Sequence, residues 1–180
     1  MAKNDQEESF EKLMSANLAR VVDFIKFAET KNAALLTFCS AWILASMNLI
    51  SSGKPLPQFV ISGLKLALPF FAIAACISIA SFIPKLSIRE VLKSKAPGNN
   101  LLYFGDVAQT PIDDFRRRTR ERYTPKGDRS ITDEYVDDLS VQIAVNSRIA
   151  TRKMRLFGYG AYAVLLALFM IAAPAIGQIL

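Results

Sequence analysis

The chain has 180 residues, of which 52% are hydrophobic, and its formal net charge at pH 7 is +6. This apolar content is too high for an ordinary soluble globule, and the length suits a single domain. There is no histidine, so the commonest general base and the commonest metal ligand are both missing. We find no catalytic set, no metal site and no need for a cofactor, and we predict that the protein is not an enzyme.

The N-terminal segment, residues 1–32, is predicted to be a cytoplasmic amphipathic helix. It is charged and lacks the apolar core of a cleaved signal peptide. One mostly apolar face has helical spacing and consists of Phe10, Leu13, Asn17, Val21, Phe24 and Ala28. Because no glycine or proline intervenes before residue 33, we expect this helix to continue into the first apolar run.

Three apolar runs are long enough to cross a bilayer. Residues 33–50 carry no charge, residues 59–83 are interrupted mainly by Lys65 and Pro69, and residues 156–180 form the third run. Residues 33–83 are predicted to be a transmembrane hairpin of two spans, in which a row of small residues favours close helix packing. That row is Ala72, Cys76 and Ala80.

The distribution of positive charge predicts the topology. Residues 84–155 hold most of the lysines and arginines, whereas the connection at residues 51–58 holds only Lys54. The positive-inside rule then places the N-terminus and residues 84–155 in the cytoplasm and the C-terminus outside. In a bacterium this describes a multi-pass protein of the inner membrane with a periplasmic C-terminus. The predicted fold class is all-α, with about three transmembrane helices that extend into a cytoplasmic helical bundle.

The cytoplasmic region at residues 84–155 is basic and helical. An apolar stretch at residues 101–106 precedes Thr110 and Pro111, which have the pattern of a capped helix start. The arginine-rich helix that follows would face anionic lipid, solvent or a ligand, and nucleic acid is the least favoured partner. Residues 130–133 carry a second capping pattern and open the last helix. Its early acidic residues suit the helix dipole better than a metal site; they are Asp133, Glu134, Asp137 and Asp138.

The last helix carries a stripe of basic residues just before the third apolar run. Arg148, Arg152 and Arg155 share one face, and Lys153 lies beside it. Two interpretations remain open, an anchor at the membrane interface and a site for a phosphate-bearing ligand, since guanidinium groups suit phosphate oxygens. Asn146 lies near the apolar face of the same helix, where it would fix helix register or bind a nucleobase.

Three stretches resemble the membrane effector family of bacterial Pycsar anti-phage systems. Residues 100–108 read Asn-Leu-Leu-Tyr-Phe-Gly-Asp-Val-Ala, which is similar to the central signature of that family. Residues 29–33 are similar to the segment that leads into its first span, and residues 142–153 to its pre-membrane helix. The resemblance extends from about Phe10 to about Phe169.

The resemblance implies an effector that responds to cyclic CMP or cyclic UMP made by a partner pyrimidine cyclase. Activation would disrupt the inner membrane and cause abortive infection, and we expect a homo-oligomer embedded in the lipid bilayer. The site residues rest on position and chemistry and not on the resemblance: Arg148 or Arg152 would hold the phosphate, and Tyr103 and Phe104 would stack on the base or hold their loop in place. The candidate ligand-binding residues are Arg148, Arg152, Lys153, Asn146, Tyr103, Phe104, Asp106 and Lys31.

Other functions fit the same sequence features. A membrane scaffold or lipid-binding protein would use the basic helix without any small ligand. An effector gated by another cyclic nucleotide would keep the membrane role and differ only in its ligand. A membrane enzyme is disfavoured, because the sequence lacks histidine and any paired acidic constellation.

Overall fold

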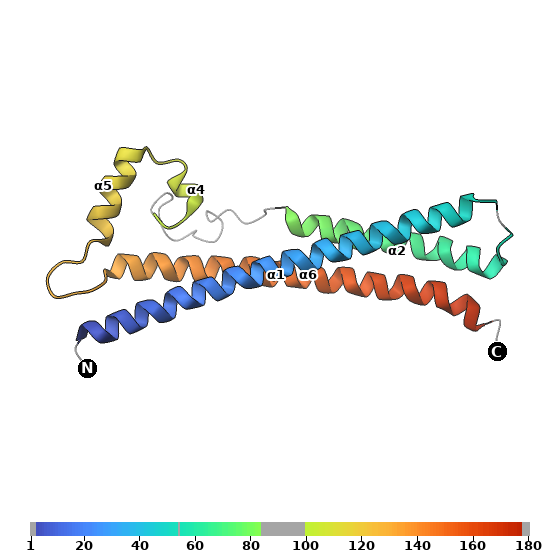
Figure 1. Cartoon of the computed structure of the whole chain (residues 1–180), viewed down its shortest axis with the longest axis horizontal. Coiled ribbons are helices and arrows are strands. Elements are labelled where there is room, and N and C mark those ends of the chain that lie inside the picture. The colour runs from blue at the N-terminus through green and yellow to red at the C-terminus, as the bar shows by residue number, and fades with distance from the viewer. Residues whose placement is uncertain (1–2, 54, 84–99, 178–180) are drawn as a thin grey trace. The chain divides into compact units, whose positions relative to one another are not determined.

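The computed structural model describes residues 3–53, 55–83 and 100–177, which are mainly helical and contain no strand (Figure 1). The prediction of an all-α fold is therefore confirmed. The helices are α1 (Lys3–Ser51), α2 (Gln58–Phe82), α4 (Phe104–Val107), α5 (Ile112–Tyr123) and α6 (Asp133–Ile176). As predicted, α1 continues without a break from the charged N-terminal segment into the first apolar run.

Three of these helices, α1, α2 and α6, are long and apolar enough to cross a membrane. This confirms the prediction of three spans. The chain divides into two compact units, to which α1 and α6 both contribute. We call Met1–Ile25 with Lys85–Ala150 the polar unit, and Lys26–Pro84 with Thr151–Leu180 the apolar unit. Residues 84–99 of the predicted cytoplasmic region lie outside the described residues.

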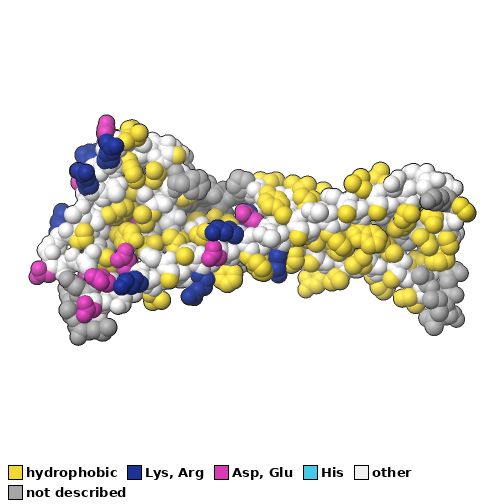
Figure 2. All heavy atoms as spheres, in the orientation of Figure 1, with side chains coloured by type: hydrophobic (Ala, Val, Ile, Leu, Met, Phe, Trp, Pro, Cys, Tyr) yellow, Lys and Arg dark blue, Asp and Glu magenta, His cyan; other side chains and the backbone are white. Residues whose placement is uncertain are grey.

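The apolar unit packs α1, α2 and α6 around one core. Its buried members are Cys39, Ala67, Phe71, Ala74, Ala163, Val164 and Ala167. Phe71 of α2 is fully buried, and Trp42 of α1 stacks on its ring with centroids 5.7 Å apart. Hydrophobic side chains cover most of the visible face of this unit (Figure 2). Such a surface is stable in lipid and not in water.

Small residues set the spacing between α2 and α6. A Cβ atom placed on Gly63 would lie 3.1 Å from the Met170 carbonyl oxygen and 3.3 Å from the Ile171 Cα atom. The backbones therefore approach closely at this point, as small residues permit in membranes. The predicted row of small residues is wrong, because Ala72 and Cys76 are exposed. The packed side of α2 instead carries Gly63, Leu64, Ala67, Phe71, Ala74, Ser78 and Ser81.

The polar unit packs the start of α6 against α5 and the segment before α4. Leu101, Ile131, Leu139 and Val145 supply its buried apolar side chains. α6 begins within the predicted capping pattern at residues 130–133, but its cap is Thr132, whose hydroxyl accepts a hydrogen bond from the Tyr135 amide at 3.2 Å. Ser130, the first residue of that pattern, instead donates its hydroxyl to Glu7. The predicted cap of α5 is wrong. Pro111 occupies the cap position without a side-chain bond, and Thr110 donates its hydroxyl to the Asp106 carbonyl.

α1 and α6 run parallel in each unit. In the polar unit the Glu7 carboxylate, near the start of α1, accepts hydrogen bonds from the Ser130 amide and hydroxyl, just before α6. In the apolar unit Asn32 lies against Lys153, and Leu35 lies against Gly160. Within the apolar unit, the contact positions thus advance together along the two helices.

Candidate functional site

Two cations of α6 meet the C-terminal end of α2. The Lys153 ammonium donates to the Ser81 carbonyl oxygen at 3.0 Å. The Arg152 guanidinium donates to the carbonyl oxygens of Ile83 at 3.2 Å and Ala80 at 3.3 Å. The last carbonyls of a helix have no partner within the helix, and they form the negative end of its dipole. Arg152 and Lys153 therefore satisfy these carbonyls and hold the end of α2 against α6.

Lys153 also forms an ion pair with α1. Its ammonium lies 2.9 Å from a Glu29 carboxylate oxygen, and 5.7 Å from the centre of the Phe82 ring. The Lys153 side chain is only 11% exposed, whereas that of Glu29 is 45% exposed. A buried ammonium is costly unless it is paired and hydrogen-bonded, and Lys153 has both kinds of partner. Lys153 therefore has a structural role as well as an electrostatic one, because its side chain connects α6 to both α1 and α2.

Asn32 adds a buried amide to the same region. Its Nδ2 group donates to the Ala28 carbonyl at 2.8 Å and to the Lys153 carbonyl at 3.2 Å. The residue is fully buried, and its Oδ1 atom has no hydrogen-bond partner among the described residues. An amide in this position fixes the register of two packed helices, since a shift along the axis would break its bond across the interface.

Lys31 is held by aromatic rings. Its ammonium lies 4.6 Å from the centre of the Phe27 ring in α1 and 5.0 Å from that of Phe157 in α6. A cation over an aromatic face is attracted by the ring quadrupole. Three predicted site residues, Lys31, Arg152 and Lys153, thus each contact another long helix of the apolar unit. We call these three residues, with Glu29 and Asn32, the boundary cluster.

The other five predicted site residues belong to the polar unit. Asn146 is half-buried and Arg148 is exposed on α6. Tyr103 is half-buried just before α4, which begins at Phe104 and includes a half-buried Asp106. The Tyr103 carbonyl accepts the amides of Asp106 and Val107, so this stretch closes a tight turn. The assignment of all eight residues to one ligand site stays a prediction.

The polar unit contains a polar network that the sequence did not reveal. The Asp138 carboxylate accepts two hydrogen bonds from Arg122, at 2.8 and 2.9 Å, and one from the Tyr123 hydroxyl at 2.6 Å. The Asp138 side chain is 7% exposed. Asp138 therefore has a role that the helix-dipole interpretation did not include, since its carboxylate binds α5. Asp133 and Glu134 do lie in the first turn of α6.

The network perturbs the ionisation of its members. Burial raises the pKa of the Tyr123 phenol above its ordinary value, and the adjacent Asp138 carboxylate raises it further. The hydrogen bond to Asp138 likewise raises the pKa of the Arg122 guanidinium. Both shifts favour the pairing of a charged guanidinium and a neutral phenol with one carboxylate.

Asn100, the first residue of the central signature, also contacts this network. Its Nδ2 group donates to the Asp138 carbonyl oxygen at 3.1 Å, and its Oδ1 atom accepts the Leu102 amide at 2.9 Å. Asn100 is 5% exposed. The one sequence feature that pointed to it was its place at the start of the signature. Its contacts give that position a structural role, because they attach the segment before α4 to α6.

The basic face of α5 is partly neutralised by its own acids. Arg117 pairs with Asp114 at 2.9 Å and with Glu121 at 3.4 Å. Arg116 lies 4.0 Å from Asp113. Exposed pairs of this kind contribute little to stability, but they reduce the net positive field of the helix. The basic helix is therefore a weaker anion site than its arginine count suggests.

The fold is that of an α-helical membrane protein with three candidate spans. The boundary cluster joins these three helices through basic side chains. Residues 13–178 match the family model described as the Pycsar effector protein domain, PycTM. The chain therefore belongs to the Pycsar effector protein family, which confirms the resemblance seen in the sequence.

A curated relative supports this membership. The chain is 42% identical over 163 residues to the Pycsar effector protein RsPycTM of a Rhizobium species. The alignment covers 91% of this chain and 93% of the relative. No solved structure matches the chain.

Proposed function

We propose that this protein is an anti-phage effector of the inner membrane that is gated by a cyclic pyrimidine mononucleotide. Cyclic CMP or cyclic UMP, made by a partner pyrimidine cyclase, binds the cytoplasmic part of a homo-oligomer. Binding leads to disruption of the membrane and to abortive infection. The observation that carries this proposal is family membership over residues 13–178, combined with three apolar helices that meet at a basic cluster.

Arg152 is the residue of the boundary cluster best suited to bind the phosphate. Its hydrogen-bond acceptors are two backbone carbonyls, which carry no formal charge, and the side chain is half-buried. The phosphodiester group of a cyclic mononucleotide carries one negative charge, shared by two oxygens, and forms stronger, charge-assisted hydrogen bonds with a guanidinium. Arg148, exposed in the polar unit, is the alternative phosphate-binding residue.

Lys153 has a different role in this proposal. Its ammonium is buried and already paired with Glu29. Moving it to a ligand would leave a carboxylate and a helix end without their partner. We therefore assign Lys153 to holding α1, α2 and α6 together, while Arg152 exchanges acceptors. Arg152 then leaves the carbonyls of Ala80 and Ile83, which weakens the contact between α6 and α2.

The continuous α6 helix supports the coupling step. It runs from Asp133 to Ile176 and carries both Arg152 and the last apolar run. A ligand changes the population of two helix arrangements only if it prefers one of them. A preference of about 3 kcal/mol changes the ratio roughly a hundredfold.

The test is a dye-release assay with purified protein inserted in liposomes. Cyclic CMP, cyclic UMP, cyclic AMP and a cyclic dinucleotide are added separately, and empty liposomes serve as the control. Release with a cyclic pyrimidine alone supports the proposal and identifies the ligand. Release with the dinucleotide alone supports an effector gated by a different nucleotide. If none of the four nucleotides causes dye release from liposomes in which the protein is shown to be inserted, the proposal is contradicted and a scaffold is favoured.

A further inference from the structure

Two side chains of the polar unit carry buried polar atoms that have no hydrogen-bond partner among the described residues. These atoms are Nε2 of Gln142 in α6 and Oγ1 of Thr119 in α5. Gln142 as a whole is only 8% exposed. A buried donor without an acceptor costs free energy, because it has lost its bonds to water and gained none within the protein. An unsatisfied buried amide is rare in a folded protein and therefore calls for an explanation.

Both residues lie one helical turn from the contact between α5 and α6. Thr119 precedes Tyr123 by four residues, and the Tyr123 hydroxyl donates to the Asp138 carboxylate at 2.6 Å. Gln142 follows Asp138 by four residues on α6. Residues four apart share one side of a helix. The two unsatisfied atoms therefore belong to the facing sides of α5 and α6.

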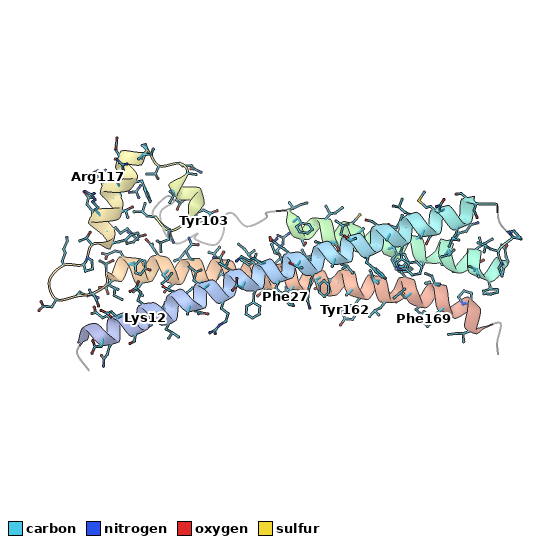
Figure 3. The ribbon with its side chains drawn as sticks, in the orientation of Figure 1. Lys12, Phe27, Tyr103, Arg117, Tyr162 and Phe169 are labelled. Carbon is cyan, nitrogen blue, oxygen red and sulfur yellow. The ribbon has the colours of Figure 1, made fainter. Side chains whose placement is uncertain are left out.

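The segment that carries the central signature contacts the same side of α6. Asn100 donates to the Asp138 carbonyl oxygen at 3.1 Å. Tyr103 follows in the chain, and in the view of Figure 3 it lies between α4 and α6. A Cβ atom placed on Gly105 would lie 2.5 Å from Cε1 of the Tyr103 ring. Only glycine leaves room for the ring there, so the position of this aromatic side chain depends on Gly105.

A pyrimidine base can supply the acceptor that the Gln142 amide lacks. Nε2 is a donor, and both cytosine and uracil carry a carbonyl oxygen, O2, on the edge that pairs in duplexes. Asn146, which the sequence predicts to bind a nucleobase or to fix helix register, follows Gln142 by four residues and lies on the next turn of the same side. Proteins recognise unstacked bases by hydrogen bonds to this edge and by stacking on aromatic rings. Gln142, Asn146 and Tyr103 supply both kinds of contact.

We propose that Gln142 binds the base of the ligand, with its Nε2 group donating to the O2 carbonyl oxygen of cytosine or uracil. Thr119, on the facing side of α5, supplies a second polar contact to the same ligand. This inference rests on the proposed function and names the residues that recognise the base. It concerns the base alone and leaves the assignment of the phosphate unchanged.

The proposal predicts opposite effects on stability and on binding. Replacing an unsatisfied buried polar group by an apolar group of the same shape is neutral or stabilising, and methionine has nearly the length and volume of glutamine. Gln142→Met should therefore raise the Tm of the ligand-free protein by about 2–4 °C. The same change should weaken binding of cyclic CMP or cyclic UMP about tenfold, because the base loses a donor.

Thermal unfolding and isothermal titration calorimetry on the purified full-length protein in detergent micelles measure the two effects. Gln109→Met is the matched control, because Gln109 is exposed in the same unit and the substitution is identical. Thr119→Val tests the second contact in the same way, and Thr124→Val, at an exposed position, is its control.

Weaker binding by Gln142→Met, with a Tm equal to or above that of the original protein, supports the proposal. Unchanged binding overturns it, and so does an equal loss of binding in Gln109→Met. A lower Tm also overturns it, because the amide would then already have a partner in the ligand-free protein. If the original protein binds neither nucleotide, the proposed function fails and this assignment fails with it. Binding that survives Gln142→Met removes this residue and leaves the proposed function standing.

Discussion

Asn32 of α1 donates a hydrogen bond to the backbone carbonyl oxygen of Lys153 in α6, across 3.2 Å. The side chain of Lys153 in turn reaches Glu29 of α1, three residues before Asn32. Each helix therefore contacts the other through one side chain at the same depth. This reciprocal contact fixes both the register and the rotation of the pair. It lies beside Arg152, the residue proposed to change its partner on ligand binding.

Removing the Glu29 carboxylate should destabilise the three-helix contact. In Glu29→Gln the Lys153 ammonium stays buried without a counter-charge, whereas Glu29→Gln with Lys153→Met removes both charges. Because Glu29 is 45% exposed, solvent screens the pair, and we expect a loss of about 1 kcal/mol for the single variant. Denaturant unfolding in detergent micelles measures this loss. A double variant that is less stable than the single one would contradict the assignment.

Ligand binding should depend on Arg152 and Arg148. Replacing both by Ala is expected to abolish binding of a cyclic pyrimidine nucleotide, because whichever of the two guanidinium groups holds the phosphate is then lost. Membrane insertion should be unchanged, since neither side chain lies in an apolar run. Isothermal titration calorimetry on the purified protein measures binding, and Arg117→Ala is the control, because that guanidinium is engaged by Asp114 and Glu121. Unchanged binding in the double variant would remove both residues from the site.

The Asp138 network should contribute measurably to stability. Asp138→Asn removes the carboxylate that accepts three side-chain hydrogen bonds. The Arg122 side chain, which is only 25% exposed, then loses its charged partner. Charge-assisted bonds of this kind predict a loss of about 2–3 kcal/mol. Asp128→Asn, at an exposed position before α6, should stay within about 0.5 kcal/mol of the original protein. Thermal unfolding followed by circular dichroism gives both values, and equal effects would argue against the network.

The same substitution should lower the pKa of Tyr123. Burial and the Asp138 carboxylate hold that pKa above the ordinary value of 10.0. The neutral phenol therefore adds stability that is fully present below pH 10 and is lost as pH rises through the raised pKa. Alkaline absorbance titration should show one tyrosine that ionises late, and this late step should vanish in Tyr123→Phe. In Asp138→Asn it should move toward pH 10; a step that does not move would assign the shift to burial alone.

Gly63 should tolerate no large side chain. The atoms nearest to an added Cβ belong to the α6 backbone at Met170 and Ile171, which cannot rotate away. Gly63→Leu is therefore expected to separate α2 from α6 and to cost about 1–3 kcal/mol in thermal unfolding. Gly158→Leu is the matched control, because among the described residues no atom outside its own stretch of helix lies within 4 Å of a Cβ atom added there. A smaller effect at Gly63 than at Gly158 would contradict this packing.

The sequence predicted the helices well because their pattern is carried within each element. Unbroken periodicity identified the continuous α1, and the capping pattern at residues 130–133 located the start of α6, although it did not single out Thr132 as the cap. The capping pattern at Thr110 and Pro111 was misleading, because the Thr110 hydroxyl donates to the preceding Asp106 carbonyl and does not cap α5. The spacing of Ala72 and Cys76 was also misleading, since several faces of an apolar helix contain small residues and spacing alone does not identify the packed one.

The site could be predicted only in part, because its partners come from other helices. The stripe of Arg148 and Arg152 was visible in one helix, but the acceptors of Arg152 are backbone carbonyls of α2, which have no side-chain signature. Likewise, no pattern within α6 shows that Asp138 binds Arg122 of α5. Residues whose partners lie within four positions were accessible to sequence reasoning, and those with distant partners required the structure.

Because Trp42 stacks on Phe71, the intrinsic fluorescence of the protein reports on the contact between α1 and α2. The chain has a single tryptophan, and its indole lies nearly parallel to a ring of the adjacent span, at an angle of 11°. Indole emission depends on what touches the ring and on how polar its surroundings are. Any motion that parts α1 from α2 within the bilayer would thus change the intrinsic fluorescence, so that opening of the helices can be timed in unlabelled protein.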